Sequence, residues 1–194
     1  MTRKGGGVRI IAGRWRGRRV AVPDGRGLRP TPDRVRETLF NWLAPDLPGA
    51  RCLDLFAGSG VLGLEALSRG AAQAVLVERA APVARALREQ VAALEAEAAR
   101  VVQQDALRWL RGAAEPFDIV FLDPPFDADL WEPVAAALEE GGWLAPEARI
   151  YAETPAHGDE PAWPVNWHGR RQRIAGGVRY DLLCRETPEA DGEE

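Results

Sequence analysis

The strongest constraint on the fold of this chain is a regular alternation of strand-like and helix-like segments that begins near residue 51. Short apolar runs are each followed by a longer segment with apolar residues at helical spacing. Strands are expected at 52–56, 74–78, 101–103, 118–122 and 149–153, and helices at 61–69, 82–98, 106–110 and 128–140. Because strands that alternate with helices pair in parallel through right-handed crossovers, this order predicts a doubly wound α/β sheet.

Two hairpin-like segments flank this alternating region. Apolar residues alternate over residues 8–22, which predicts two short strands with a turn at 13–17. Near the other end, residues 163–173 and 178–185 flank a Gly-Gly pair and predict an antiparallel hairpin at the sheet edge. This hairpin completes an expected, mostly parallel sheet of seven strands.

A helix is expected between the first hairpin and the sheet. Thr31 is placed to cap it, Pro32 fits its first position, and apolar residues recur at helical spacing up to Leu43. A length of 194 residues suits one domain with small appendages. We therefore divide the chain into a basic N-terminal extension at 1–48, an α/β domain at 49–185 and an acidic, disordered tail at 186–194.

Positive charge is concentrated at the N-terminus. The formal net charge is −4, yet residues 1–36 contain eleven cations and two acids, a net +9, which leaves −13 for the remainder. A basic arm on an acidic body predicts docking on a nucleic acid, because the planar fork of arginine suits phosphates and stacks on bases better than lysine does. Two alternatives remain, a merely solvated extension and a helix stapled by an Arg34–Glu37 pair. The candidate contacts are Arg9, Arg14, Trp15, Arg16, Arg18, Arg19, Arg29, Arg34 and Arg36.

A glycine-rich loop follows the first expected strand of the sheet. Gly58, Gly60 and Gly63 match the pattern G-x-G-x-x-G, in which a ligand lies against bare backbone at the end of a strand. The pattern fits a dinucleotide, but Asp54 would repel a pyrophosphate and suits the ammonium group of an amino acid. S-adenosylmethionine carries such a group and no phosphate.

Further candidate cofactor contacts follow the second and third strands. Glu78 is placed to accept hydrogen bonds from ribose hydroxyls in either interpretation. Asp105 and Ala106 are placed to offer an acceptor and a backbone donor to adenine, although Asp105 serves equally well as the N-cap of the next helix. The complete candidate set is Asp54, Phe56, Ala57, Gly58, Ser59, Gly60, Glu78, Arg79, Asp105 and Ala106.

A buried strand that ends in Asp-Pro-Pro-Phe is the most specific motif in the chain. The prolines stiffen the turn and leave backbone carbonyls without ladder partners. The Asp123 carboxylate and the Pro124 carbonyl are placed to orient an exocyclic amine of a flipped base, on which Phe126 stacks. In the alternative, the motif only ends a strand and Phe126 packs in the core. The candidate catalytic residues are Asp123, Pro124, Pro125 and Phe126.

Other classes of site have little support. Cys52 and Cys184 are far apart in the sequence, and His157 and His168 do not complete a ligand set, so neither a disulfide nor a metal site is expected. The sequence has no apolar stretch long enough to cross a bilayer and no signal-like segment, so we expect a cytoplasmic protein without membrane contact.

Longer stretches of the sequence resemble the RsmD family of bacterial 16S rRNA guanine-N2 methyltransferases. The resemblance is carried by Val8–Arg18, Arg29–Leu43, Leu53–Ala71 and Phe121–Phe126. It implies S-adenosylmethionine as methyl donor, a guanine of 16S rRNA as acceptor and a partly assembled 30S subunit as partner. It also implies a class I, Rossmann-like methyltransferase domain at 49–185, with an N-terminal hairpin and helix that grip rRNA.

Three alternative functions remain. Adenine-N6 methylation of DNA or RNA keeps the chemistry, but no separate domain that would read a DNA sequence is apparent. A nucleotide-binding module or NAD-dependent oxidoreductase would use the same glycine loop, yet it leaves the Asp-Pro-Pro-Phe motif and the basic arm unexplained. A non-catalytic assembly factor would bind rRNA and be indifferent to Asp123→Ala.

Overall fold

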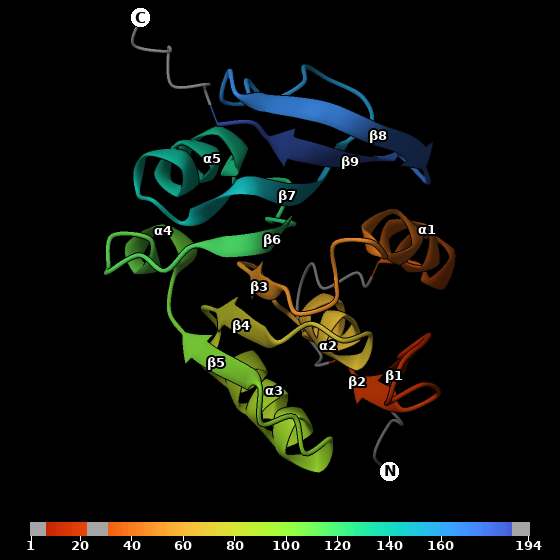
Figure 1. Cartoon of the computed structure of the whole chain (residues 1–194). Coiled ribbons are helices and arrows are strands. Elements are labelled where there is room, and N and C mark those ends of the chain that lie inside the picture. The colour runs from red at the N-terminus through yellow and green to blue at the C-terminus, as the bar shows by residue number, and fades with distance from the viewer. Residues whose placement is uncertain (1–6, 23–30, 188–194) are drawn as a thin grey trace, which may run out of the picture.

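The computed structural model of the protein describes residues 7–22 and 31–187 (Figure 1). Its large sheet has the strand order β5-β4-β3-β6-β7-β9-β8. Neighbouring strands from β5 to β7 are parallel, whereas β9 is antiparallel to both β7 and β8. The predicted doubly wound, mostly parallel sheet of seven strands is therefore confirmed. The strands are β3 (Arg51–Asp54), β4 (Gln73–Glu78), β5 (Ala99–Gln103), β6 (Phe117–Leu122), β7 (Leu144–Pro155), β8 (Trp167–Ala175) and β9 (Val178–Arg185).

The strand order reverses between β3 and β6. From β3 the chain moves outward through β4 to β5, and it then returns to the other side of β3 as β6. In open α/β sheets, ligands bind outside the carboxyl ends of the strands at such a reversal. The glycine loop follows β3 and the Asp-Pro-Pro-Phe motif follows β6. The topology therefore brings together two motifs that are far apart in the sequence.

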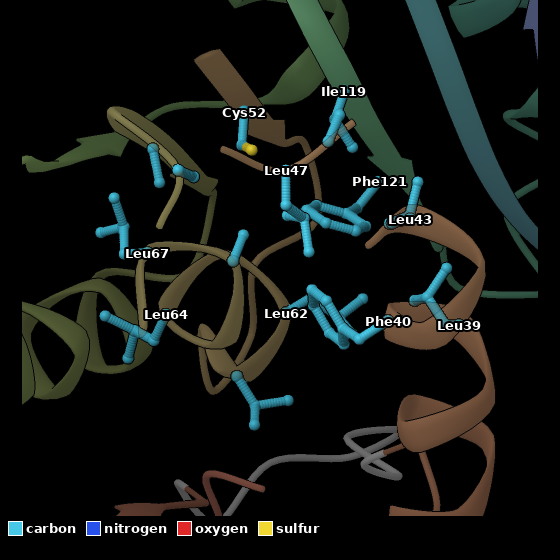
Figure 2. Close-up of a cluster of buried hydrophobic side chains, with 14 of the residues drawn as sticks. Leu39, Phe40, Leu43, Leu47, Cys52, Leu62, Leu64, Leu67, Ile119 and Phe121 are labelled. Carbon is cyan, nitrogen blue, oxygen red and sulfur yellow. The ribbon is translucent and has the colours of Figure 1, made fainter. Parts of the chain in front are cut away.

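Helices cover both faces of the sheet. Figure 2 shows the core between the sheet, α1 and α2, where the ring centroids of Phe40 and Phe121 lie 6.0 Å apart. Burial of such apolar stripes, at roughly 1.5–3 kcal/mol for each large side chain, stabilises the helices more than intrinsic propensity does. No helix within the described ranges is long and apolar enough to span a membrane. One face carries α1 (Asp33–Leu43), α2 (Val61–Ser68) and α3 (Ala81–Ala93), and the other carries α4 (Ala106–Trp109) and α5 (Trp131–Glu140).

The N-terminus of α1 differs from the expectation. Pro32 occupies the N-cap position, and no side chain caps the helix. The Pro32 carbonyl accepts the N–H groups of Val35 and Arg36. Thr31 instead donates its hydroxyl to the Glu153 carboxylate on β7 at 2.6 Å. The predicted Thr31 cap is therefore wrong, because a charged acceptor on β7 takes the hydroxyl that the cap would have used.

Two boundaries also differ. The third helix ends at Ala93 rather than Ala98, and Glu95 follows with a φ of 52°, a left-handed conformation that an α-helix does not continue. The strand predicted at 149–153 extends over Leu144–Pro155 as β7, because its second half also pairs with β9. Both differences lie in connections that depend on tertiary pairing.

The N-terminal hairpin forms as expected and packs on α2. β1 (Gly7–Arg9) pairs antiparallel with β2 (Arg19–Ala21). The turn between them contributes Trp15 to the core cluster that lies beneath α1 and α2. This extension therefore shares one core with the α/β domain. Of the predicted acidic tail, residues 188–194 lie outside the described part of the chain.

Polar side chains of α2 hold the hairpin turn in place. Glu65 accepts the N–H groups of Ile11 at 2.8 Å and Ala12 at 3.0 Å. The Ser68 hydroxyl accepts the N–H of Trp15 at 3.0 Å and donates to the carbonyl of Ala12 at 2.6 Å. These four bonds satisfy turn backbone that would otherwise lose its hydrogen-bond partners on burial.

The turn approaches α2 so closely that residue 13 has to be glycine. Gly13 has a φ of +81°, and a Cβ at this position would lie 1.8 Å from the carbonyl oxygen of Ser68. The same oxygen accepts the N–H of Arg14 at 2.8 Å. The hairpin is therefore fixed to α2 by backbone as well as by side chains.

Candidate active site and nucleic-acid interface

Three carboxylates meet at the carboxyl edge of the sheet. Asp54 ends β3, Asp123 follows β6, and Glu153 lies near the end of β7. Leu122 pairs with Ala152 in the parallel register. The residues that follow this pair, Asp123 and Glu153, therefore lie side by side.

All three acids face the side of the sheet that α1 covers. The side chains two positions before them, Cys52, Phe121 and Tyr151, belong to the core cluster beneath α1. Because side chains alternate between the two faces of a strand, residues two positions apart share a face. The acids therefore converge in the space between the sheet edge and the N-terminus of α1.

Asp54 is buried beneath the glycine loop. Its Oδ2 accepts the N–H of Gly63 at 3.3 Å. Burial raises the pKa of Asp54 to about 7, and the negative charge of Glu78 adds to the effect. Among the described residues, no arginine forms an ion pair with Asp54. A ligand that brings a positive charge would stabilise its ionised form.

The glycine loop turns sharply between β3 and α2. Gly60 has a φ of +75°, and a Cβ there would lie 2.3 Å from Cδ1 of Leu87. Glu78, at the end of β4, accepts the N–H groups of Gly58 at 3.1 Å and Ala80 at 2.7 Å. Each carboxylate oxygen has a second lone pair, so Glu78 retains the capacity to accept hydroxyl groups of a ribose.

The remaining predicted cofactor contacts occupy different positions. Asp105 is the N-cap of α4, where its Oδ1 accepts the N–H of Arg108 at 3.1 Å. Ala106 is buried as the first residue of α4, and Arg79 is exposed after β4. The structural role that the sequence left open for Asp105 is therefore realised. The loop between β3 and α2 carries Phe56, Ala57 and Ser59.

The Asp-Pro-Pro-Phe turn leaves β6 at the strand reversal. Desolvation, together with the negative charges of Glu153 and Asp54, holds the pKa of Asp123 well above its usual value. Phe126 is 40% exposed, and its ring centroid lies 5.7 Å from that of Trp131 at the start of α5. The ring is therefore supported on one side and partly open to solvent, in contrast to the alternative in which it packs in the core.

Glu153 belongs to this site and was missed in the sequence analysis. Its Oε1 accepts the hydroxyl groups of Thr31 at 2.6 Å and Tyr151 at 2.9 Å. Burial raises the pKa of Glu153, and these two hydrogen bonds oppose the shift. Its backbone carbonyl accepts Nε1 of Trp131 at 2.8 Å. The available sequence signal was an acid at the end of the strand predicted at 149–153, the position that Glu78 has in the strand predicted at 74–78.

The predicted nucleic-acid contacts separate into exposed and buried side chains. Trp15 is only 8% exposed, and the guanidinium of Arg14 lies 4.0 Å from its ring centroid. The prediction that Trp15 contacts a nucleic acid is therefore wrong, because its ring is part of the core. Arg29 lies outside the described residues. The exposed candidates are Arg9, Arg14, Arg16, Arg18, Arg19 and Arg34.

Arg36 is the second correction, because its side chain is 0% exposed. Its Nη2 donates to Oδ1 of Asp33 at 2.7 Å and to the carbonyl of Arg9 at 2.8 Å. Its Nη1 donates to Oε2 of Glu65 at 3.4 Å. Arg36 therefore joins α1, α2 and the hairpin from inside, and the prediction that it contacts a nucleic acid is wrong.

The loop and the acids around it fit S-adenosylmethionine. The fit rests on Asp54, a buried carboxylate that needs a cationic partner, at the start of a loop whose glycines leave backbone uncovered. Glu78 would hold the ribose hydroxyls from the end of the adjacent strand. Neither Asp54 nor Glu78 would be suited to a pyrophosphate, since both side chains are acids.

Known proteins are similar to this sequence over nearly its whole length. Residues 8–184 match the family described as conserved hypothetical protein 95. Ribosomal RNA small subunit methyltransferase D of Escherichia coli strain K12 is 53% identical over 182 residues, which cover 94% of this chain and 92% of that protein. The protein of the same name from Haemophilus influenzae is 47% identical and covers 91% of this chain and 93% of its own length.

Solved structures agree with these relatives. A putative methyltransferase from Escherichia coli, yhhF, has a TM-score of 0.87 at 50% identity and covers 94% of this chain and 99% of its own. A putative methylase from Haemophilus influenzae has a TM-score of 0.80 at 43% identity and covers 94% and 100%. The expected fold and enzyme class are confirmed, and the chain belongs to the conserved hypothetical protein 95 family, the RsmD family of S-adenosylmethionine-dependent methyltransferases.

Proposed function

We propose that this protein methylates the exocyclic N2 of a guanine in 16S rRNA, within an assembled or partly assembled 30S subunit in the cytoplasm. The observation that carries the proposal is the Asp-Pro-Pro-Phe turn, which stands beside the glycine loop at the strand reversal with an exposed aromatic ring. The names of the relatives support a small-subunit rRNA substrate. When bound, S-adenosylmethionine supplies a methyl group on a positively charged sulfonium.

Asp54, Glu78 and the glycine loop bind and orient the donor in this proposal. The Asp54 carboxylate pairs with the ammonium group, and its raised pKa falls when that positive charge is adjacent. Glu78 accepts the ribose hydroxyls. The backbone of the glycine loop provides the surface between these two acids.

Asp123 and Pro124 orient the acceptor amine. The amine of guanine is planar and a poor nucleophile, because its lone pair is delocalised into the ring. Hydrogen bonds from its two N–H groups to the Asp123 carboxylate and the Pro124 carbonyl favour a pyramidal nitrogen. Phe126 stacks on the flipped base. The raised pKa of Asp123 makes its carboxylate a competent acceptor for the proton that N2 loses when its new bond to carbon forms.

The exposed arginines of the hairpin bind rRNA phosphates in this proposal. Arg14, Arg16, Arg18 and Arg19 surround the turn and the second strand of the hairpin. Because Glu65 and Ser68 fix that turn to α2, the arginines have a defined position relative to the glycine loop at the other end of the same helix.

The proposal is tested by methyl transfer from labelled S-adenosylmethionine to undermethylated 30S subunits, naked 16S rRNA and duplex DNA in parallel. N2-methylguanosine in a digest of the 30S subunits or the 16S rRNA is the expected product. N6-methyladenosine would overturn the proposed acceptor in favour of the alternative named above, and label in DNA alone would overturn the rRNA substrate.

The role of Asp123 is tested by Asp123→Asn. This change keeps the shape of the side chain but removes the charge that orients the amine, and we expect turnover to fall about 100-fold or more. Binding of S-adenosylmethionine, measured by calorimetry, should persist. Asp127→Asn is the matched control, because Asp127 is exposed just beyond the same turn. Loss of cofactor binding in Asp123→Asn would assign the residue to the architecture of the site.

A further inference from the structure

A row of side chains crosses the sheet from the active site to its edge. Glu153 on β7 pairs with Tyr180 on β9, and Tyr180 pairs with Arg173 on β8. Asp123 lies beside Glu153 at the other end of the row. Adjacent strands are about 4.8 Å apart, so three spacings place the backbone of Arg173 about 14 Å from that of Asp123. Directly opposed residues share a face, so this row lies on the side that α1 covers.

Two arginines of β8 give this edge its positive charge. Arg171 pairs with Leu182, which belongs to the core cluster beneath α1, so Arg171 and Arg173 share the α1 side. Nη1 of Arg173 donates to Oγ1 of Thr38 on α1 at 3.2 Å, and Nη1 of Arg171 donates to the backbone carbonyl of Arg170 at 3.0 Å. Within residues 7–22 and 31–187, neither arginine forms an ion pair.

The same line of charge continues onto α1. Arg34 precedes Thr38 by one helical turn and is exposed. In the described part of the chain it forms no ion pair, so the Arg34–Glu37 pair that the sequence allowed is not made. Figure 1 shows α1 beside the ends of β8 and β9. We call Arg34, Arg171 and Arg173 the α1–β8 strip.

The nearest acids do not neutralise this strip. Asp181 precedes Leu182 on β9 and so points to the opposite face, where its Oδ1 accepts Nε2 of Gln172 at 2.9 Å. Glu160 pairs with Arg179, which also lies on that opposite face. β8 itself contains no Asp or Glu. Asp33 and Glu37 lie beside Arg34 on α1, but within the described residues no acid forms an ion pair with Arg34, Arg171 or Arg173.

We propose that the α1–β8 strip is a second rRNA-binding surface, which binds the phosphate backbone of the strand that flanks the target guanine. This inference rests on the proposed function. Arginine forks match phosphate geometry, and cations without acid partners need no ion pair broken before they bind. Tyr180 and Glu153, which lie between Arg173 and Asp123, are buried, so the strip flanks the active site at the edge of the sheet. The hairpin arginines lie on the other side of α1, so rRNA would be held on both sides of the entering base.

The experiment compares Arg171→Ala/Arg173→Ala with wild type on 30S subunits. Loss of two phosphate contacts should raise the KM for 30S about tenfold with little change in kcat. It should also reduce the slope of log K against log salt by about two, one for each arginine. Arg108→Ala is the matched control, because Arg108 is an exposed arginine on the opposite face. Affinity for S-adenosylmethionine and the melting temperature should stay unchanged in both.

A charge-preserving variant separates docking from structure. Arg171→Lys/Arg173→Lys should recover most of the rRNA affinity, since a phosphate contact depends chiefly on charge. If wild type methylates 30S but the alanine variant has the same KM and salt slope as wild type, the proposed rRNA-binding role of the strip is overturned and the proposed function stands. A fall in kcat at constant KM would also overturn it, in favour of a positioning role through Thr38. If wild type fails to methylate rRNA, the proposed function and the strip both fail.

Discussion

The protein buries acids in two places, and the two places differ in whether the acids have cationic partners. At the hairpin clamp, Glu65 accepts two backbone N–H groups and pairs with Arg36 at 3.4 Å and with Arg69 at 2.8 Å. At the active site, Asp54, Asp123 and Glu153 converge with no arginine in the described residues paired to any of them. The buried acid of the clamp has cationic partners, whereas the acids of the site have none within the described residues.

The difference teaches which cluster serves architecture and which serves ligands. A buried acid with two cations and two N–H donors has its charge compensated within the fold, and removing one cation weakens that compensation. Burial raises the pKa values of all three acids, and neighbouring negative charges add to the effect at Asp54 and Asp123, so a cationic ligand would stabilise their ionised forms on binding. Bound ligand should therefore stabilise the fold most strongly at the carboxyl edge of the sheet.

The largest loss of stability is expected where the hairpin clamp is broken. Arg36→Met removes one of the two cations paired with the buried Glu65, together with the ion pair to Asp33, and should lower the free energy of unfolding by about 3 kcal/mol. Denaturant unfolding at neutral pH measures the change. Arg34→Met is the matched control, since Arg34 is exposed on the same helix, and it should change stability by less than about 0.5 kcal/mol.

A second variant identifies the cause of that loss. Adding Glu65→Gln to Arg36→Met removes the negative charge of residue 65, while the amide oxygen of the new side chain still accepts an N–H of the turn. Part of the lost stability should return. If the double variant is no more stable than Arg36→Met, the loss comes from packing of the long arginine side chain rather than from its charge.

The next effect concerns Asp54 and depends on pH. Its folded pKa of about 7 lies above the unfolded value near 3.8, so the cost of ionising it is absent below pH 4 and grows as pH rises towards 7. Asp54→Asn removes this cost, and without ligand it should be more stable than wild type at pH 8 by up to about 4 kcal/mol. Urea unfolding of both proteins at pH 4 and pH 8 measures the difference, which should vanish at pH 4.

Asp127→Asn controls for the change of an acid to an amide. It lies on the surface near the same edge, and it should leave stability nearly unchanged at both pH values. Equal stability of Asp54→Asn and wild type at pH 8 would mean that ionised Asp54 has a compensating partner, and the contrast between the two clusters would then fail.

The smallest effect sharpens the contrast within the active site. The charged and titratable neighbours of Asp123 are Asp54 from β3, and Glu153 and Tyr151 from β7. Among the neighbouring charges, that of Glu153 raises the pKa of Asp123 most. Glu153→Gln removes this charge and so lowers the pKa of Asp123. The acid limb of the pH–rate profile should move to lower pH, and kcat at high pH should fall roughly tenfold because Asp123 is a weaker base.

A purely structural role for Glu153 predicts a different result. Gln still accepts the hydroxyl groups of Thr31 and Tyr151 through its amide oxygen, so the local geometry is kept. Glu140→Gln, on the exposed side of α5, is the control and should leave the pH–rate profile in place. A drop in kcat with an unmoved acid limb would assign Glu153 to structure alone.

Periodicity was enough to predict the sheet, and local chemistry was enough to predict the Asp-Pro-Pro-Phe turn. Strand and helix patterns differ in period, and parallel strands place their ends at one edge whatever their exact lengths. Asp54 and Asp123 could therefore be assigned to one site before any coordinates were known.

Residues whose role depends on a distant partner could not be predicted. In the sequence, Arg36 looks like any surface cation. Only the approach of Glu65 from α2 makes its burial favourable. Thr31 has the residue type and the position typical of a helix cap. Only the register of β7 brings Glu153 within reach of its hydroxyl. Trp15 fits either a stacking platform or a core, and the packing of the hairpin on α2 decides between them.

The α2 helix has a consequence for how a nucleotide is selected. It begins at the glycine loop and ends at Ser68, which holds the hairpin turn, and its eight residues span about 12 Å at 1.5 Å per residue. In the proposed function, this length would set the distance between the bound methyl donor and the rRNA backbone held by the hairpin. A guanine would then be chosen by its distance along the folded rRNA from that backbone, and the enzyme would need few contacts that read its neighbours' bases.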